Sequence, residues 1–190
     1  EPDGRVSAYG APIGYPNYPV LLADGRLFVS DSGGYLASDG GIVRIDPDGA
    51  TERLPLPGLA FANGMCLDGD HLLVVESQNP GVVRVALEGG DVEDVVRLPG
   101  TIPDGLALDA EGGLWVACYR PDRVLRVARD GAVEIVVDDW TGWEVSMPTN
   151  VCFAGPDLRT LVIASLGSAA ISAFDPGVAG LPLARPVLGA

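Results

Sequence analysis

Short apolar runs that end at polar turns recur along the whole chain at nearly constant spacing. Four of these runs are similar to one another: RLFVSD, LLVVES, LWVACY and LVIASL. Three are followed by a second alternating segment, IVRI, VVRV or VLRV, and the fourth is followed by the weaker AISAF. Alternation with a period of two predicts β-strands in sheets that are covered on both faces. Apolar residues do not recur at helical spacing over any useful length, so the pattern predicts an all-β chain.

A polar residue marks the same phase of four successive units. These residues are Asn17, Asn63, Asp104 and Asn150, at spacings of 46, 41 and 46 residues. Seven residues after each of them comes an acid: Asp24, Asp70, Glu111 and Asp157. Candidate outer strands such as VEDVVRL and VEIVVDD close the units. Four short strands in a unit of about 40–45 residues are typical of a β-propeller blade.

The repeat predicts one β-propeller domain over residues 1–190, built of four-stranded blades. Four blades start at Asn17, and residues 1–10 are similar to the end of a preceding blade. Because the first residue is Glu1 rather than Met, we expect N-terminal blades to be missing from this sequence. An open arc of blades exposes strand edges and apolar faces, so self-association through these edges is a further expectation.

Composition narrows the classes of function. Gly (26 residues) and Pro (16 residues) are abundant, which suits short strands joined by tight turns. A net charge of −14 without a basic stripe argues against a nucleic-acid partner, and no apolar run reaches the length of a membrane span. Three widely spaced cysteines predict free, mostly buried thiols in a reducing compartment, and therefore a cytoplasmic protein. His71 is the only histidine, which argues against a catalytic triad or a His-rich zinc site.

The four phased Asn and Asp residues are the main candidates for chemistry. The first strand of a propeller blade lines the central channel, so these side chains are expected to form part of a ring at one mouth. Four oxygen-bearing side chains, one of them charged, suit a hard divalent cation. The alternative is that each is a turn residue that caps its own backbone. Four occurrences in phase favour the ring.

Four phrases in order carry a resemblance to a known family: PNYPVLLADGRLFVSDSGG, ANGMCLDGDHLLVVES, PDGLALDAEGGLWVA and PTNVCFAGPDLRTLVIAS. Over nearly its whole length the chain resembles the senescence marker protein (regucalcin)/gluconolactonase/luciferin-regenerating family. The resemblance implies a six-bladed propeller, of which this chain holds about four blades. It also implies one divalent metal ion at the channel mouth. Ca²⁺ is the first expectation for the metal, with Zn²⁺, Mg²⁺ or Mn²⁺ as alternatives.

The resemblance also implies roles for single residues. Asn63 and Asp104 match metal ligands, and Asp104 matches the general base. Asn17 matches an Asn that helps to hold the substrate or the water on the metal. Substrate contacts are further expected from the loops that border the mouth, where Tyr15, Tyr35 and Arg120 lie, together with Glu76, Tyr119 and Trp143.

The chain departs from the family pattern at two places. The remaining family ligand is a Glu in an EGP-type phrase on the first blade, and this chain has no such phrase. Tyr15 stands where the family often carries an Arg that grips the substrate. Tyrosine can hydrogen-bond to or stack on a sugar ring but cannot form a bidentate cationic contact, which leaves open whether gluconolactone itself is the substrate.

The sequence therefore predicts a divalent-metal-dependent hydrolase of sugar lactones or similar small cyclic esters. One alternative is a non-catalytic, metal-stabilised propeller that acts as an interaction platform, because a fold alone does not define a function. A second alternative is the chemistry of strictosidine synthase-like enzymes. It is less favoured because their channel does not need the ring of Asn and Asp side chains.

Overall fold

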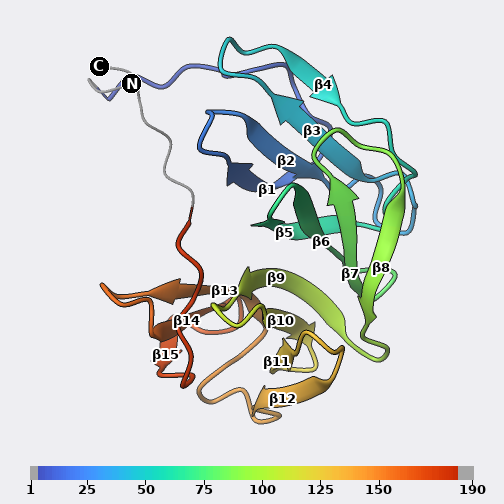
Figure 1. Ribbon diagram of the computed structural model, residues 1–190. Helices are drawn as coiled ribbons and strands as arrows, with labels where there is room; N and C mark the ends of the chain where they lie inside the picture. Colours follow the sequence, from blue (N-terminus) through green and yellow to red (C-terminus); the bar gives the residue numbers. More distant parts are fainter. Residues whose placement is uncertain (1–3, 184–190) are drawn as a thin grey trace.

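The computed structural model describes residues 4–183 of the 190-residue chain, and in this part all regular structure is β-strand. The strands form four antiparallel sheets that succeed one another around a centre as propeller blades (Figure 1). No helix that could span a membrane occurs in the described part. The predicted all-β propeller is confirmed.

Each blade follows the order of the chain, with its first strand innermost. Blade 1 consists of β1 (Pro16–Leu21), β2 (Leu27–Asp31), β3 (Gly41–Ile45) and β4 (Thr51–Arg53). Blade 2 consists of β5 (Ala62–Asp68), β6 (His71–Glu76), β7 (Gly81–Ala86) and β8 (Val92–Arg97). Blade 3 consists of β9 (Ile102–Leu108), β10 (Leu114–Arg120), β11 (Arg123–Val127) and β12 (Val133–Asp138). Blade 4 has three strands among the described residues: β13 (Pro148–Ala154), β14 (Thr160–Ser165) and β15 (Ser172–Phe174).

The cores lie between the blades, and the alternation of each strand explains why. In β6, Leu72 and Val74 pack into the cluster shared with blade 1, whereas Leu73 and Val75 pack into the cluster shared with blade 3. Successive side chains of a strand point to opposite faces, so an all-apolar run fills two cores at once. A third cluster, around Trp115, joins blades 3 and 4.

The cysteines and the single histidine take ordinary structural places. All three cysteines are free: Cys118 is buried, Cys66 is half-buried and Cys152 is exposed. Burial raises the pKa of the Cys118 thiol to about 12, and burial likewise raises the pKa of Cys66. The expectation of buried thiols therefore holds for Cys118 and is wrong for Cys152. His71 opens β6 at a turn, with its Nδ1 2.6 Å from Asp70 Oδ1.

Neighbouring inner strands approach so closely that only glycine fits at two positions. A Cβ atom on Gly64 of β5 would lie 2.5 Å from the Asp104 carbonyl oxygen and 2.7 Å from the Gly105 Cα atom of β9. A Cβ atom on Gly105 would in turn collide with the Asn150 side chain of β13. These glycines directly follow Asn63 and Asp104, so the close approach sets the spacing of the ring residues.

We expect Gly64→Ala to lower the free energy of unfolding by about 1–3 kcal/mol, because the added methyl group meets backbone that cannot move aside without shifting a blade. Urea denaturation measures this loss. Gly14→Ala is the matched control, since its nearest neighbours are the Asp31 carboxylate oxygens at 3.7 Å. The free energy of unfolding of that variant should be unchanged or higher by up to about 1 kcal/mol. Equal effects of the two substitutions would contradict the close approach.

Candidate active site

The four phased residues lie on the four innermost strands: Asn17 on β1, Asn63 on β5, Asp104 on β9 and Asn150 on β13. These strands are consecutive neighbours around the centre, with contacts from β1 to β5, from β5 to β9 and from β9 to β13 (Figure 1). The predicted order of the ring residues therefore follows from the fold. The contacts of their side chains differ from one blade to the next.

Asn17 and Asn63 are each held by a serine that follows the second strand of their blade. Asn17 Nδ2 donates to Ser32 Oγ at 3.0 Å, and Ser32 Oγ donates to the Ala62 carbonyl oxygen of the next blade at 2.8 Å. In blade 2, Asn63 Nδ2 donates to Ser77 Oγ at 3.1 Å, and Ser77 Oγ donates to the Pro103 carbonyl oxygen at 2.7 Å. Each serine thus joins a ring residue to the inner strand of the following blade.

Asp104 is half-buried next to Asn63. Burial raises the pKa of Asp104 to about 6, and a hydrogen bond with the Asn63 side chain opposes this rise in part. Its surroundings therefore disfavour the charged form, as they do for a carboxylate that lacks a counterion. No basic side chain within residues 4–183 forms an ion pair with it.

The buried carboxylates of the described chain are different, because every one of them contacts an arginine. These pairs are Asp31 with Arg53, Glu76 with Arg97, Asp109 with Arg126 and Asp122 with Arg120. A buried carboxylate without a partner is costly. Asp104 differs from them, because it is half-buried and has no arginine partner among the described residues.

Asn150 does not present a free oxygen in the same way. Its Oδ1 accepts a hydrogen bond of 2.9 Å from the N–H of Val151, and its side chain packs against Gly105. A carboxamide oxygen that binds its own backbone is less available to a ligand. This contact agrees with the absence of a family-assigned role for Asn150.

An aromatic group borders the inner strands of blades 1 and 2. Tyr15 and Tyr35 are 56% and 63% exposed, and their ring centroids lie 6.0 Å and 5.6 Å from that of Phe61. Tyr15 directly precedes β1, and Phe61 directly precedes β5. The two predicted substrate contacts are therefore brought together by Phe61, a residue that the sequence did not single out.

Arg120 lies at the end of β10, and its guanidinium group stacks over the Tyr119 ring at 5.5 Å. It also forms an ion pair with Asp122. Arg120 is exposed, so both contacts leave part of the guanidinium group facing solvent. Its role as a substrate contact stays a prediction.

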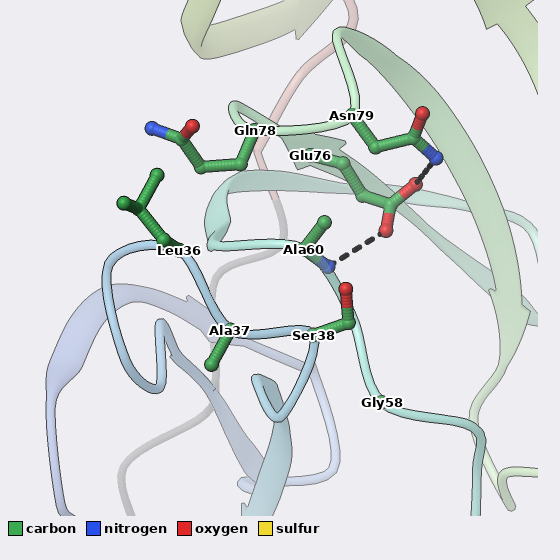
Figure 2. A pocket seen from close by; sticks show the side chains of 8 residues that line it. All are labelled: Leu36, Ala37, Ser38, Gly58, Ala60, Glu76, Gln78 and Asn79. Carbon is green, nitrogen blue, oxygen red and sulfur yellow. Dashed lines mark hydrogen bonds between the residues drawn. The ribbon is translucent and has the colours of Figure 1, made fainter.

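A groove of about 430 Å³ runs between the loops of blades 1 and 2 (Figure 2). Its polar floor is Glu76, whose Oε1 accepts from the Ala60 N–H at 2.8 Å and whose Oε2 accepts from Asn79 Nδ2 at 3.2 Å. Arg97 donates to the same Oε2 atom at 3.0 Å. Glu76 was expected to contact substrate, and its buried carboxylate accepts three hydrogen bonds that hold these loops. These bonds give it a structural role, and its role as a substrate contact stays a prediction.

Trp143, the last of the weaker candidates, lies away from this group of loops. It is 86% exposed and lines a second groove, between β12 and the strands of blade 4. The structure thus does not bring Trp143 together with the other candidates, and its role as a substrate contact stays a prediction.

The donor chemistry of the ring suits a hard divalent cation. Asp104 offers a carboxylate and Asn63 a carboxamide oxygen, which are the ligand types that Ca²⁺ and Mg²⁺ prefer. The two side chains contact each other through the Asn63 NH₂ group, which donates to the carboxylate. The described residues contain no group of three or more His, Cys, Asp or Glu side chains that could hold a metal by themselves. The roles of Asn63 and Asp104 as metal ligands stay predictions, and a cation at this place would need further oxygens, which water or substrate can supply.

Comparison with known proteins decides the family. The model of the SMP-30/gluconolactonase/LRE-like region matches residues 15–167, a segment that contains all four ring residues. The chain belongs to this family. Its structure is also similar to that of the calcium-binding protein regucalcin from Agrobacterium tumefaciens, with a TM-score of 0.64 and 21% identity. That likeness covers 90% of this chain and 64% of the other, and it supports the fold.

The names of similar proteins indicate different activities. The chain is 32% identical to pentonolactonase XacC of Haloferax volcanii, over 77% of this chain and 52% of that protein. It is 35% identical to strictosidine synthase-like 13 of Arabidopsis thaliana, over 57% of this chain and 31% of that protein. The chain thus spans about half the length of the first relative and slightly less than a third of the second. The expectations of preceding blades and of association through blade edges stay predictions.

Proposed function

We propose that the protein carrying this chain is a divalent-metal-dependent hydrolase of sugar lactones or similar small cyclic esters. The observation that carries the proposal is Asp104, a half-buried carboxylate with a raised pKa and no arginine partner among the described residues, beside Asn63 on the next inner strand. Membership of a family that includes sugar lactonases supports the choice of substrate class.

In this proposal Asn63 and Asp104 hold the metal through their side-chain oxygens, with Ca²⁺ as the first candidate. The bound ion would polarise the lactone carbonyl group and acidify water. Asp104 takes a proton from the water that adds to the carbonyl carbon. When the ring C–O bond breaks, Asp104 returns this proton to the leaving oxygen, so the product is the open hydroxy acid.

The neighbouring side chains bind and orient the substrate. Asn17 is fixed by Ser32 and offers its carboxamide oxygen to a substrate hydroxyl. Tyr15 and Tyr35 offer exposed ring faces and hydroxyl groups to a sugar ring, and Arg120 offers the free part of its guanidinium group to a hydroxyl or carboxylate. The free cysteines, which form no disulfide in the described part, fit a proposed cytoplasmic location.

The test of this function is proton release from a panel of five- and six-carbon aldonolactones, measured against spontaneous hydrolysis. We expect at least one lactone to be opened catalytically by the intact protein that carries this chain. If none is opened with any of Ca²⁺, Zn²⁺, Mg²⁺ or Mn²⁺ present, the enzyme proposal is wrong and the non-catalytic platform is favoured.

The raised pKa of Asp104 predicts how stability depends on pH when metal is removed. In chelator, the folded protein binds this proton up to about pH 6, whereas the unfolded chain releases it near its ordinary pKa of about 3.9. The folded state therefore holds more protons between these values, and stability falls as the pH rises through them. Allowing for partial exposure, we expect wild type to lose about 1–2 kcal/mol relative to Asp104→Asn between pH 4 and pH 7.

Urea denaturation of both proteins at these two pH values, with chelator present, measures the difference. Adding Ca²⁺ at pH 7 should restore the stability of wild type, since a ligand that binds only the folded state stabilises it. A difference between the two proteins that does not change with pH would contradict a desolvated Asp104.

A further inference from the structure

Ser32 and Ser77 are buried, and each makes the same two hydrogen bonds, one to the Asn of its own blade and one to a carbonyl oxygen of the next blade. A serine hydroxyl has one proton. In Ser77 this proton is used by the Pro103 carbonyl oxygen at 2.7 Å, so the oxygen atom can only accept from Asn63. Ser77 therefore selects the NH₂ edge of the Asn63 carboxamide and turns its oxygen to the opposite edge.

The serine position is not filled in the same way in blade 3. In blades 1, 2 and 3, the residues that pair with the first residue of the third strand are Asp31, Glu76 and Cys118, respectively. The next residue along the chain is Ser32 in blade 1, Ser77 in blade 2 and Tyr119 in blade 3. With Tyr119 at this place, no small hydroxyl group is available to hold Asp104. The fold thus fixes the carboxamide of Asn63 beside Asp104 and leaves the carboxylate itself without such a clamp.

We propose that Ser77 is a positioning residue, which holds the Asn63 carboxamide with its oxygen directed away from the blade and available to the metal. The proposal rests on the proposed function for the identity of the ligand. Ser32 is the matched residue of blade 1. It makes the same hydrogen bonds, but its partner Asn17 is not the side chain that hydrogen-bonds with Asp104.

Metal affinity separates positioning from a general effect on the fold. Both Ser77→Ala and Ser32→Ala remove a bond to a carbonyl oxygen of the next blade, so both should lower the melting temperature. Only Ser77→Ala should weaken binding of Mn²⁺, titrated into the intact protein and followed by the signal of free Mn²⁺. We expect a loss of about 10-fold or more, which is typical when the partner of a ligand is removed, and a change of less than about twofold for Ser32→Ala.

A second measurement does not depend on metal or substrate. The side-chain NH₂ group of Asn63 gives its own NMR signal, which is assigned by its loss in Asn63→Asp. Hydrogen exchange of this group should be slow in wild type and in Ser32→Ala and much faster in Ser77→Ala. If Ser77→Ala does not fold, Ser77→Cys gives the same comparison, because a thiol is a weak hydrogen-bond partner of similar size.

Unchanged Mn²⁺ affinity in a folded Ser77→Ala protein, or an equal loss in Ser32→Ala, would overturn the proposal. So would exchange of the Asn63 NH₂ group that does not respond to the loss of Ser77. If wild type binds no metal and opens no lactone, the proposed function fails by itself, and the exchange measurement still decides whether Ser77 orients Asn63.

Discussion

Asp104→Asn should abolish most lactone hydrolysis, by about 10²–10⁴-fold in kcat, even when metal is saturating. The substitution keeps the size of the side chain and one oxygen ligand, but it removes the charge and the ability to take a proton. Metal binding should weaken at the same time, because the only carboxylate that the described ring contributes is lost. Proton-release kinetics at increasing concentrations of Ca²⁺ separate the two effects.

Asn150→Ala is the control for this prediction. Asn150 lies in phase with Asp104 on the adjacent inner strand, but its Oδ1 is used by the Val151 N–H. We expect its loss to reduce kcat far less than the loss of Asp104 does. Similar losses in both variants would show that the ring is merely polar, and an Asp104→Asn protein with wild-type kcat would remove Asp104 from the mechanism.

Asp109→Ala should lower the free energy of unfolding by about 3–5 kcal/mol, because it leaves buried partners without an acceptor. Asp109 is fully buried, and its Oδ2 accepts from Trp115 Nε1 at 2.9 Å and from Arg126 Nε at 2.8 Å. Its Oδ1 accepts from the N–H groups of Glu111 and Gly113. Burial alone raises the pKa of Asp109, but these hydrogen bonds outweigh burial and lower it, so the group is charged at neutral pH.

Glu111→Ala provides the comparison within the same turn. Glu111 Oε2 also accepts from Arg126, at 2.9 Å, but its side chain is 70% exposed. An exposed ion pair contributes about 0–1 kcal/mol, so this variant should unfold almost like wild type. Thermal or urea denaturation of the two variants measures the contrast, and an Asp109→Ala protein as stable as Glu111→Ala would contradict the structural role of the buried carboxylate.

The blades and the ring could be predicted from the sequence because both depend on periodicity. Alternating apolar residues define the strands, and the spacing of Asn17, Asn63, Asp104 and Asn150 defines the inner positions. These signals are local, or they repeat from blade to blade. The family resemblance added the expected pairing of Asn63 with Asp104, and the structure does bring these two side chains together.

The contacts between blades could not be predicted in the same way. Ser32 and Ser77 recur at the end of the second strand, but their carbonyl partners Ala62 and Pro103 lie 30 and 26 residues away. Whether such atoms meet depends on how closely two sheets pack, which the pattern of one strand does not determine. The ion pair of Glu76 was missed for a similar reason, because its partner Arg97 comes from the outermost strand of the blade.

Asp109 shows a third limit. Asp109 and the buried Leu22 of blade 1 occupy equivalent turn positions. In both turns the N–H of this residue donates to a carbonyl oxygen on the other side of the turn. From the sequence alone, a charged residue is not expected to lie in a core. It is stable there because Trp115 and Arg126 are placed by the neighbouring strands to donate to it.

Metal removal and readdition in the lactone assay test the central claim most directly. The account predicts that chelated protein loses proton release from its best lactone and that Ca²⁺, or another of the four candidate metals, restores it in wild type but not in Asp104→Asn. Hydrolysis that persists at the full rate after complete removal of metal, or that Asp104→Asn supports as well as wild type, would contradict it.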